Sequence, residues 1–449
     1  MSGPATDELL GAELELDVTA VAHGGSCVAR HEGRVVFVRH TLPGERVRVR
    51  VTGSGGGGSY LRADAVEVLT PAPGRVTPPC PAARPGGCGG CDWQHASLAT
   101  QRELKGAVVA EQLSRLAGLD RVVTVERVPL PGEAASSLPD EIAAPATADR
   151  LDGAGRDQVT EPDQAEEPGR DDGLGWRTRM RLRTDGGRLG LRAHGSHRLV
   201  PLEDCPIADV RLGVGHLAAR RWPGRTELSL AVDARGHRYA AVDGVPRAGS
   251  AHHLLEQAAG RAWRVDGPGF WQVHPGAADV LVAAVRGALR ARPGESALDL
   301  YSGVGLFAGA LADDVGPTGA VAAVESDAGA VANARRNLHG LPMVTLWAGD
   351  VAEVLATAGA VAATVDLVVL DPPRTGARAA VVGAIADRAP RAIAYVACDP
   401  AALARDVATF AGHGYVLTGL RAFDLFPMTH HVECVALLEP ADRAVPAGG

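Results

Sequence analysis

Ser296-Ala-Leu-Asp-Leu-Tyr-Ser-Gly-Val-Gly-Leu306 decides the fold of the C-terminal part of the chain. Its first residues indicate a short buried strand, and Gly303 and Gly305 follow directly. Glycines after a strand let a ligand approach the backbone closely. Gly-x-Gly alone is a weak signal, but a second apolar strand ends in Glu325, 26 residues after Asp299. An acid at this position can accept hydrogen bonds from both hydroxyls of a ribose.

Two further apolar segments continue this pattern. One precedes Asp371-Pro-Pro-Arg374, and the other is Arg391-Ala-Ile-Ala-Tyr-Val396, which runs into Ala397-Cys398-Asp399-Pro400. Alternating strands and helices over about 170 residues predict one doubly wound α/β domain. Such sheets bind ligands at the carboxyl ends of their strands. Cys398 is therefore a candidate nucleophile, and an inert buried cysteine is the alternative.

The N-terminal residues, from about Gly11 to Leu69, contain several short β segments punctuated by glycines. Alternation and β-branched residues mark residues 14–18, 34–38, 45–51 and 63–69 as strands. Several strands in about sixty residues predict a small barrel of the oligonucleotide-binding type. Its arginines are candidate phosphate contacts or a solvated strand face: Arg30, Arg46, Arg48, Arg50 and Arg62. Cys27 is expected to be a core residue.

A cysteine-rich loop follows the barrel, with the spacing C-x7-C-x2-C. It runs from Cys80 through Cys88 and Cys91 to His95 and is too rich in glycine and proline to bury three thiols as core. Metal or cluster ligation is the better interpretation. Cys205 is the best candidate for a fourth ligand, because the remaining cysteines lie in predicted strands. Four thiolates suit either tetrahedral zinc or a [4Fe–4S] cluster, and the spacing does not choose between them.

A helix is predicted over residues 98–116, and an acidic segment follows it. Residues 131–173 contain twelve Asp or Glu and three Arg, with no apolar period. This composition predicts a disordered insertion. It accounts for the net charge of −8, since the rest of the chain then carries +1. Net charge therefore does not exclude RNA as a partner.

Trp176-Arg-Thr-Arg-Met-Arg-Leu-Arg183 alternates arginine with other residues, as a strand with one basic face does. Residues 188–192 complete a predicted hairpin. Four arginines on one face repel one another unless they meet phosphates or carboxylates. The pattern favours an RNA contact over a solvated face.

Length and composition describe a globular protein of two or three domains. The chain has 449 residues, of which 46% are hydrophobic. No window approaches eighteen apolar residues, so no membrane span is expected. The first residues lack a basic leader and an apolar core, which predicts a cytoplasmic protein in which disulfides are disfavoured.

In combination, these motifs resemble the RNA 5-methyluridine methyltransferases, which use S-adenosylmethionine. The resemblance covers nearly the whole chain apart from the acidic insertion. It implies a TRAM domain at residues 1–72, a central α+β iron–sulfur and RNA-contact domain at residues 73–265, and a Rossmann-like methyltransferase domain at residues 266–449. The resemblance also favours a [4Fe–4S] cluster over zinc, with the ligands Cys80, Cys88, Cys91 and Cys205.

The resemblance also assigns roles to single residues. It implies that Cys398 is the nucleophile and that Glu433 is the general base. The implied cofactor residues are Gln272, Tyr301, Gly303, Gly305, Glu325 and Asp371. The chain departs from the family's usual pattern in two places: Ala397-Cys-Asp-Pro400 stands where the family usually has Ser-Cys-Asn-Pro, and His274 stands where it usually has Asn. Cys434 follows the base and is expected to point into the core.

The implied reaction explains why these groups are needed. A thiolate that adds to carbon 6 of uracil makes carbon 5 nucleophilic, and a base later removes the proton from carbon 5. The expected partner is RNA with a flipped-out uridine, either 23S ribosomal RNA or transfer RNA. A non-catalytic RNA-binding protein, a cytosine-C5 methyltransferase and a radical enzyme are weaker alternatives. A monomer is expected.

Overall fold

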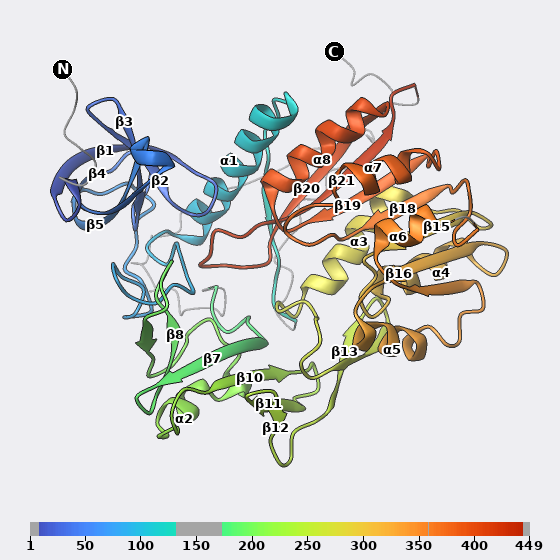
Figure 1. Ribbon diagram of the computed structural model, residues 1–449, viewed down its shortest axis with the longest axis horizontal. Coiled ribbons are helices and arrows are strands. Elements are labelled where there is room, and N and C mark those ends of the chain that lie inside the picture. Colours follow the sequence, from blue (N-terminus) through green and yellow to red (C-terminus); the bar gives the residue numbers. More distant parts are fainter. Residues whose placement is uncertain (1–8, 132–172, 358, 443–449) are drawn as a thin grey trace, which may run out of the picture.

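The computed structural model describes residues 9–131, 173–357 and 359–442. The predicted acidic insertion therefore lies almost wholly outside the described residues. Three parts are visible in Figure 1: an N-terminal barrel in blue, a central region in green, and a C-terminal α/β part in yellow to red, with helix α1 (Leu98–Ala117) between the barrel and the C-terminal part. No helix in the described ranges is long and apolar enough to cross a bilayer.

The N-terminal part is a closed five-stranded barrel with the strand order β1-β2-β3-β5-β4. Alternate residues of its strands point into one apolar core, as the sequence pattern predicts. Cys27 is fully buried in that core, as expected. The strands are β1 (Glu13–Val21), β2 (Cys27–His31), β3 (Arg34–Arg39), β4 (Arg46–Gly55) and β5 (Tyr60–Thr70). Of these, β2 was not predicted.

The arginines of β4 are engaged by carboxylates on neighbouring strands. Arg46 and Arg48 lie against Glu15, Arg48 also contacts Glu67, and Arg50 pairs with Glu13. Exposed pairs of this kind contribute little to stability. They nevertheless show that the predicted phosphate contacts on this strand are already paired within the barrel.

The central region contains a six-stranded sheet with the order β12-β11-β10-β7-β8-β9 and a separate hairpin, β13-β14. The short helix α2 (Val214–Ala218) packs beside the sheet. The strands are β7 (Arg179–Asp185), β8 (Arg188–Arg192), β9 (Leu199–Pro201), β10 (Glu227–Val232), β11 (Arg238–Val242), β12 (Val245–Pro246), β13 (His253–Ala258) and β14 (Arg261–Asp266).

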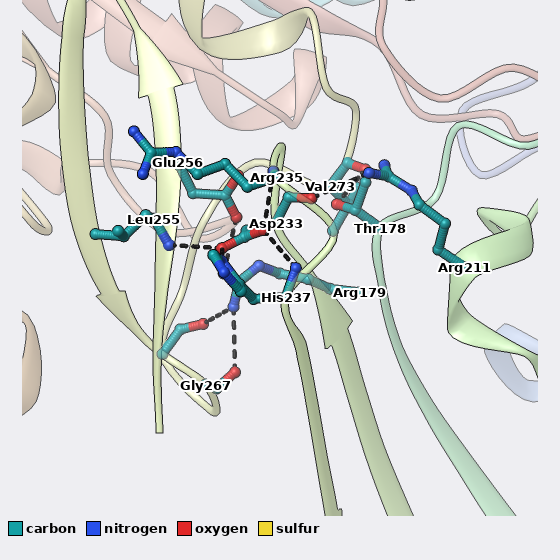
Figure 2. A network of polar contacts seen from close by, with 11 residues as sticks. Thr178, Arg179, Arg211, Asp233, Arg235, His237, Leu255, Glu256, Gly267 and Val273 are labelled. Atoms are coloured by element: carbon teal, nitrogen blue, oxygen red, sulfur yellow. Dashed lines mark hydrogen bonds and ion pairs between the residues drawn. The ribbon is translucent and has the colours of Figure 1, made fainter. Parts of the chain in front are cut away.

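A polar junction joins this sheet to the hairpin (Figure 2). The buried carboxylate of Asp233 accepts backbone hydrogen bonds from Arg235, His237 and Leu255. Beside it, Arg179 pairs with Glu256 at 3.3 Å and donates to the carbonyls of Gly267 and Gly269. Arg179 therefore belongs to an internal junction and not to an exposed basic face, which corrects the expectation for this residue.

The C-terminal part is built on a sheet with the order β17-β16-β15-β18-β19-β21-β20-β6. Helices cover both faces and define two apolar cores, which confirms the predicted α/β class. The strands are β15 (Ser296–Leu300), β16 (Ala320–Glu325), β17 (Val344–Ala348), β18 (Leu367–Leu370), β19 (Ala392–Ala397), β20 (Tyr415–Asp424) and β21 (Glu433–Pro440). The helices are α3 (Ala277–Leu289), α4 (Leu306–Val315), α5 (Ala328–Asn337), α6 (Val351–Ala356), α7 (Arg378–Ala386) and α8 (Pro400–Gly412).

Two segments from the first third of the chain complete this C-terminal part. Strand β6 (Val125–Arg127) pairs in parallel with β20 and forms one edge of the sheet. Helix α1 packs through Val109 and Leu113 into the core that also contains residues of α7 and α8. The predicted helix is thus confirmed, whereas its attachment to the C-terminal sheet was not predicted.

Lys105, the one lysine in the chain, fixes α1 to this sheet. Its side chain is fully buried, and its ammonium group lies 2.5 Å from the carboxylate of Asp424 at the end of β20. It also donates a hydrogen bond of 3.0 Å to the carbonyl of Phe426. Burial lowers the pKa of Lys105, and the attraction of Asp424 opposes that change. The charge of Lys105 therefore depends on the neighbouring carboxylate.

We predict that Lys105→Met lowers the free energy of unfolding by about 3–5 kcal/mol, because it leaves the Asp424 carboxylate buried without its counterion. Arg115→Met on the same helix is the matched control. It removes an exposed pair with Glu111 and should cost about 0.5 kcal/mol. Urea unfolding followed by circular dichroism measures both. Equal losses in the two variants would contradict the account of the buried pair.

Candidate active site

The loop after β15 leaves the sheet in an unusual backbone conformation. Tyr301, Gly303 and Gly305 all have positive φ angles, of 62°, 55° and 95°. A Cβ atom on Gly305 would lie 2.7 Å from Leu338, so glycine is required there for packing. A Cβ atom on Gly303 would meet no atom within 4 Å. The backbone at Gly303 therefore borders open space, as a loop that receives a ligand requires.

Two acids flank this loop. Glu325 ends β16 and accepts hydrogen bonds of 2.7–2.8 Å from the backbone of Gly303, Ser326 and Asp327. Asp299 is fully buried and accepts one from Ala308 at the start of α4, while its second oxygen has no hydrogen-bond partner. Burial raises the pKa of Asp299 well above its usual value. An unpartnered buried oxygen beside an open glycine loop fits a site that binds a polar ligand.

The residues expected to carry out chemistry lie at the carboxyl end of the neighbouring strands. Asp371 follows β18, and Cys398 follows β19. Strand β21 runs antiparallel to β19, with Ala397 opposite Cys434. One step further in this register, Cys398 lies opposite Glu433. Directly opposed residues have Cβ atoms about 4.5–5.5 Å apart, so the thiol and the carboxyl group face one another.

Electrostatics in this group disfavour negative charge. Burial raises the pKa of Cys398 to about 12, and the carboxyl groups of Glu433 and Asp371 add to the effect. Arg374 acts in the opposite direction. Burial raises the pKa values of both Glu433 and Asp371 as well. Because these groups compete for charge, the free protein holds protons here that isolated side chains would release.

Cys398 opens onto a cavity of about 190 Å³ that three parts of the chain enclose. The β1–β2 loop of the barrel contributes His23, Gly24 and Gly25, and α1 contributes Val108. The C-terminal part contributes Arg374, Cys398, Asp399, Pro400, His430, His431 and Val432. A cavity of this size, with a nucleophile, an arginine and several imidazoles, suits a flat polar ring.

The loop before Glu433 is fastened by residues far away in the sequence. Asp92 accepts a 2.6 Å hydrogen bond from Nδ1 of His430, and the backbone N–H groups of Asp92 and Trp93 both donate to the carbonyl of Met428 at 3.0 Å. Gln101 of α1 accepts a bond from the Met428 N–H at 2.7 Å. These contacts fix the backbone that leads into the proposed base.

The two departures from the resembling family occupy different environments. His274 is buried, stacks on Trp176, and accepts a hydrogen bond from the N–H of Gly276. Burial lowers the pKa of His274 to about 4, so it is neutral. Asp399 lines the cavity and caps α8 by accepting a bond from Ala402. Gln272 lies half-buried in the segment between β14 and α3.

The four predicted metal-binding cysteines line one small cavity. Cys80, Cys88, Cys91 and Cys205 are joined there by Arg177 and by apolar residues. The N–H of Gly90 donates to the sulfur of Cys88 at 3.4 Å. Among the described residues, no three His, Cys, Asp or Glu side chains gather tightly enough to hold a single metal ion. All four thiols border this cavity, and their role as cluster ligands stays a prediction.

The sequence did not predict that residues of the barrel would line this cavity. His23 and Gly24-Gly25 lie about 370 residues before Cys398, and no local pattern links them. The pair His430-His431 had a signal, because two histidines stand just before the proposed base. Cys434 is fully buried in the core beneath the sheet, as expected.

The buried carboxyl groups predict a pH effect on stability. The folded-state pKa of Glu433 lies above its unfolded value, so the folded protein binds its proton more tightly. The contribution of Glu433 is therefore present at low pH and is lost as pH rises above about 4.5. Glu433→Gln should raise the free energy of unfolding at pH 8 by on the order of 1 kcal/mol. At pH 4 the variant should match the wild type. Equal stability at pH 8 would contradict the burial argument.

Family comparisons match this geometry. Residues 7–66 match the TRAM domain, and residues 278–441 match the family described as tRNA (Uracil-5-)-methyltransferase. The chain is 46% identical to an RNA methyltransferase of Streptomyces coelicolor, over 97% of this chain and 95% of the relative. It is 30% identical to the 23S rRNA (uracil(1939)-C(5))-methyltransferase RlmD of a Shewanella species, over 98% of both.

A solved structure has a similar fold. The tRNA (uracil-54, C5)-methyltransferase of Pyrococcus abyssi, in complex with S-adenosyl-L-homocysteine, aligns with a TM-score of 0.63 and 21% identity. The alignment covers 95% of this chain and all of that one. At this identity the likeness concerns the fold alone. The sequence relatives, which align over almost their whole length, show more: the chain belongs to the family of S-adenosylmethionine-dependent RNA (uracil-5-)-methyltransferases.

Proposed function

We propose that this enzyme methylates carbon 5 of a uridine in 23S ribosomal RNA through a covalent bond between Cys398 and carbon 6 of the base. The observation that carries the proposal is the register of β19 and β21, which sets the Cys398 thiol opposite the Glu433 carboxyl group. Cys398 lines a cavity that is large enough for a single base, and Glu433 directly follows Val432, another residue of its lining. The relative named for 23S ribosomal RNA supports the choice of RNA.

The residues around the glycine loop fit S-adenosylmethionine, which supplies an electrophilic methyl group when bound. Gly303 borders open space, and Glu325 ends the second strand, where an acid can accept bonds from ribose hydroxyls. The remaining proposed contacts are Gln272, Tyr301, Gly305 and Asp371. Asp371 follows β18, the strand between β15 and β19, so it lies between the glycine loop and Cys398.

The chain's own groups then act in a fixed order. The Cys398 thiolate forms a bond to carbon 6, and the electron pair of the 5,6 double bond becomes available at carbon 5, which takes the methyl group. Glu433 accepts the proton of carbon 5, the double bond re-forms, and the thiolate leaves. Glu433 must be ionised to accept this proton, and the pKa raised by burial makes its carboxylate a stronger base. Arg374 is the nearby cation that favours the thiolate.

Transfer RNA is the second candidate substrate, because the family that matches residues 278–441 is described by that substrate. Mapping 5-methyluridine in ribosomal and transfer RNA from cells that lack this protein distinguishes the two. Loss of the modification from 23S RNA supports the proposal. Loss of the modification from transfer RNA alone would show that transfer RNA is the substrate in place of 23S ribosomal RNA, and the proposed mechanism would still apply.

We predict opposite phenotypes for the two proposed catalytic residues. Cys398→Ala should bind cofactor and RNA but form no product, since only the thiol can attack carbon 6. Glu433→Gln should attack and accept the methyl group but fail to remove the proton, so it should accumulate linked to methylated RNA. A denaturing gel shows that adduct as a slowly migrating band.

Cys434→Ala serves as the matched control for the thiol, because Cys434 lies in the core and away from the cavity. It should retain turnover, within about tenfold, and form no stable adduct. RNA containing 5-fluorouridine should trap the wild type, because fluorine cannot leave as a cation. Methylation by Cys398→Ala, without an adduct in either trapping experiment, would overturn the covalent mechanism.

The cysteine cavity is proposed to hold a [4Fe–4S] cluster. Its four thiols have the ligand chemistry for iron, and the Gly90 N–H already points at one sulfur, as in many cluster sites. A single zinc ion needs all sulfurs at about 2.3 Å from one point. Four thiolates suit either group, and the resemblance to the iron–sulfur-bearing members of the family is the reason to propose the cluster.

We predict that protein purified without oxygen contains about four irons per chain. Cys205→Ser should lower both the iron content and the midpoint temperature of thermal unfolding, because the cluster loses a ligand. Cys27→Ser is the control, since Cys27 lies in the barrel core and should leave the iron content unchanged. Stoichiometric zinc with no iron would contradict the assignment.

A further inference from the structure

His23 of the barrel reaches the residue next to the proposed nucleophile. Its Nε2 atom lies 3.2 Å from a carboxylate oxygen of Asp399, a residue 376 positions further along the chain. Both residues line the cavity that contains Cys398. The barrel therefore contributes to the catalytic cavity itself, in addition to any RNA surface it presents elsewhere.

The loop that carries His23 is fixed in place. The indole N–H of Trp93 donates a 3.0 Å hydrogen bond to the carbonyl of Gly25. Gly25 has a φ of 85°, and a Cβ atom there would lie 3.0 Å from the Cβ of His430. Only glycine combines this backbone conformation with so close an approach. The contact between His23 and Asp399 is thus supported by a docked loop.

The charged groups around Cys398 indicate what the contact between His23 and Asp399 does. Three carboxyl groups, those of Glu433, Asp371 and Asp399, act against a thiolate at Cys398, and Arg374 acts for it. One Asp399 oxygen accepts a bond from the N-terminus of α8, and the other faces His23. The remaining charged groups that influence this pair are Glu111 on α1 and Arg405 on α8.

We propose that His23 is a positioning residue of the catalytic centre: its imidazolium pairs with Asp399, docks the barrel loop over the cavity, and offsets the negative charge beside the Cys398 sulfur. This inference rests on the proposed role of Cys398 as the nucleophile. It gives the barrel a direct part in preparing the thiol.

The electrostatics of the pair agree with this geometry. The hydrogen bond that His23 donates to Asp399 raises the pKa of His23. Burial works against ionisation of Asp399, but the bonds from His23 and Ala402 outweigh it and lower the pKa of Asp399. The ion pair is therefore complete between these two pKa values. It is lost at high pH, as His23 gives up its proton, and at low pH, as Asp399 gains one.

The test is a double-mutant cycle with His23→Gln, Asp399→Asn and the double variant. The readout is the pH dependence of iodoacetamide labelling at Cys398, followed by mass spectrometry of its peptide in the full-length protein without RNA or cofactor. Below the thiol pKa, the rate follows the thiolate fraction. At pH 7, His23→Gln should slow labelling about three- to tenfold, because Asp399 then acts uncompensated.

The cycle separates charge from loop docking. Asp399→Asn should label at least as fast as the wild type, and adding His23→Gln to it should then have no further effect, since no carboxylate remains to offset. His31→Gln, at the end of β2 and outside the cavity, is the matched control and should label as the wild type. Unchanged labelling in His23→Gln would overturn the proposal.

Two further results would also overturn it. If His23→Gln slowed labelling equally in the wild type and in Asp399→Asn, the contact between His23 and Asp399 would not be the cause of the change in rate. Faster labelling of His23→Gln at every pH, with an unshifted pH profile, would show that the loop merely shields the thiol. Because labelling needs no methyl transfer, a failure here is distinguishable from a failure of the proposed function.

Discussion

The antiparallel pairing of β19 with β21 is the interaction on which the proposed catalytic arrangement depends. It sets Cys398 opposite Glu433, although 35 residues separate them in the sequence. Side chains alternate between the faces of a sheet, so a slip of one residue would turn Glu433 into the core and bring Cys434 to the cavity. Both faces of these strands are buried, so such a slip is opposed because it would place the Glu433 carboxyl group among apolar side chains.

The register alone does not fix the backbone before Glu433, and three residues from two other segments, helix α1 and the cysteine loop, contribute to this. Lys105 holds Asp424 and Phe426, Gln101 holds Met428, and Asp92 holds His430. Asp92 directly follows Cys91, one of the four cysteines that line the proposed cluster cavity. Loss of order in the cysteine loop would therefore displace Asp92 and, through it, His430 in the loop that precedes the proposed base. A group bound there would stabilise the site without taking part in the chemistry.

The sequence predicted features whose signals are local. Strand periodicity, the glycines after β15 and the spacing of Cys80, Cys88 and Cys91 all report on neighbouring residues, and they indicated the barrel, the α/β sheet and the cysteine cavity. Contacts between distant segments were missed: the addition of β6 to the sheet, the burial of Lys105, and the reach of His23 into the cavity. Arg179 shows the opposite error, because a basic strand pattern does not reveal an acidic partner on another hairpin.

Glu433 and Asp371 are buried beside a buried thiol, a combination that opposes folding when the groups are charged. Active sites commonly carry such a cost, which the rest of the fold must offset. Here the offset lies close by: the Lys105–Asp424 ion pair and the hydrogen bond between His430 and Asp92 stabilise the same loop. Glu433 and Asp371 do not have such close ion pairs within the described residues. A partner bonded tightly to Glu433 would occupy the oxygens that must accept the proton from carbon 5. The proposed base therefore has no ion-pair partner among the described residues, and the stabilising contacts lie in the loop that precedes it.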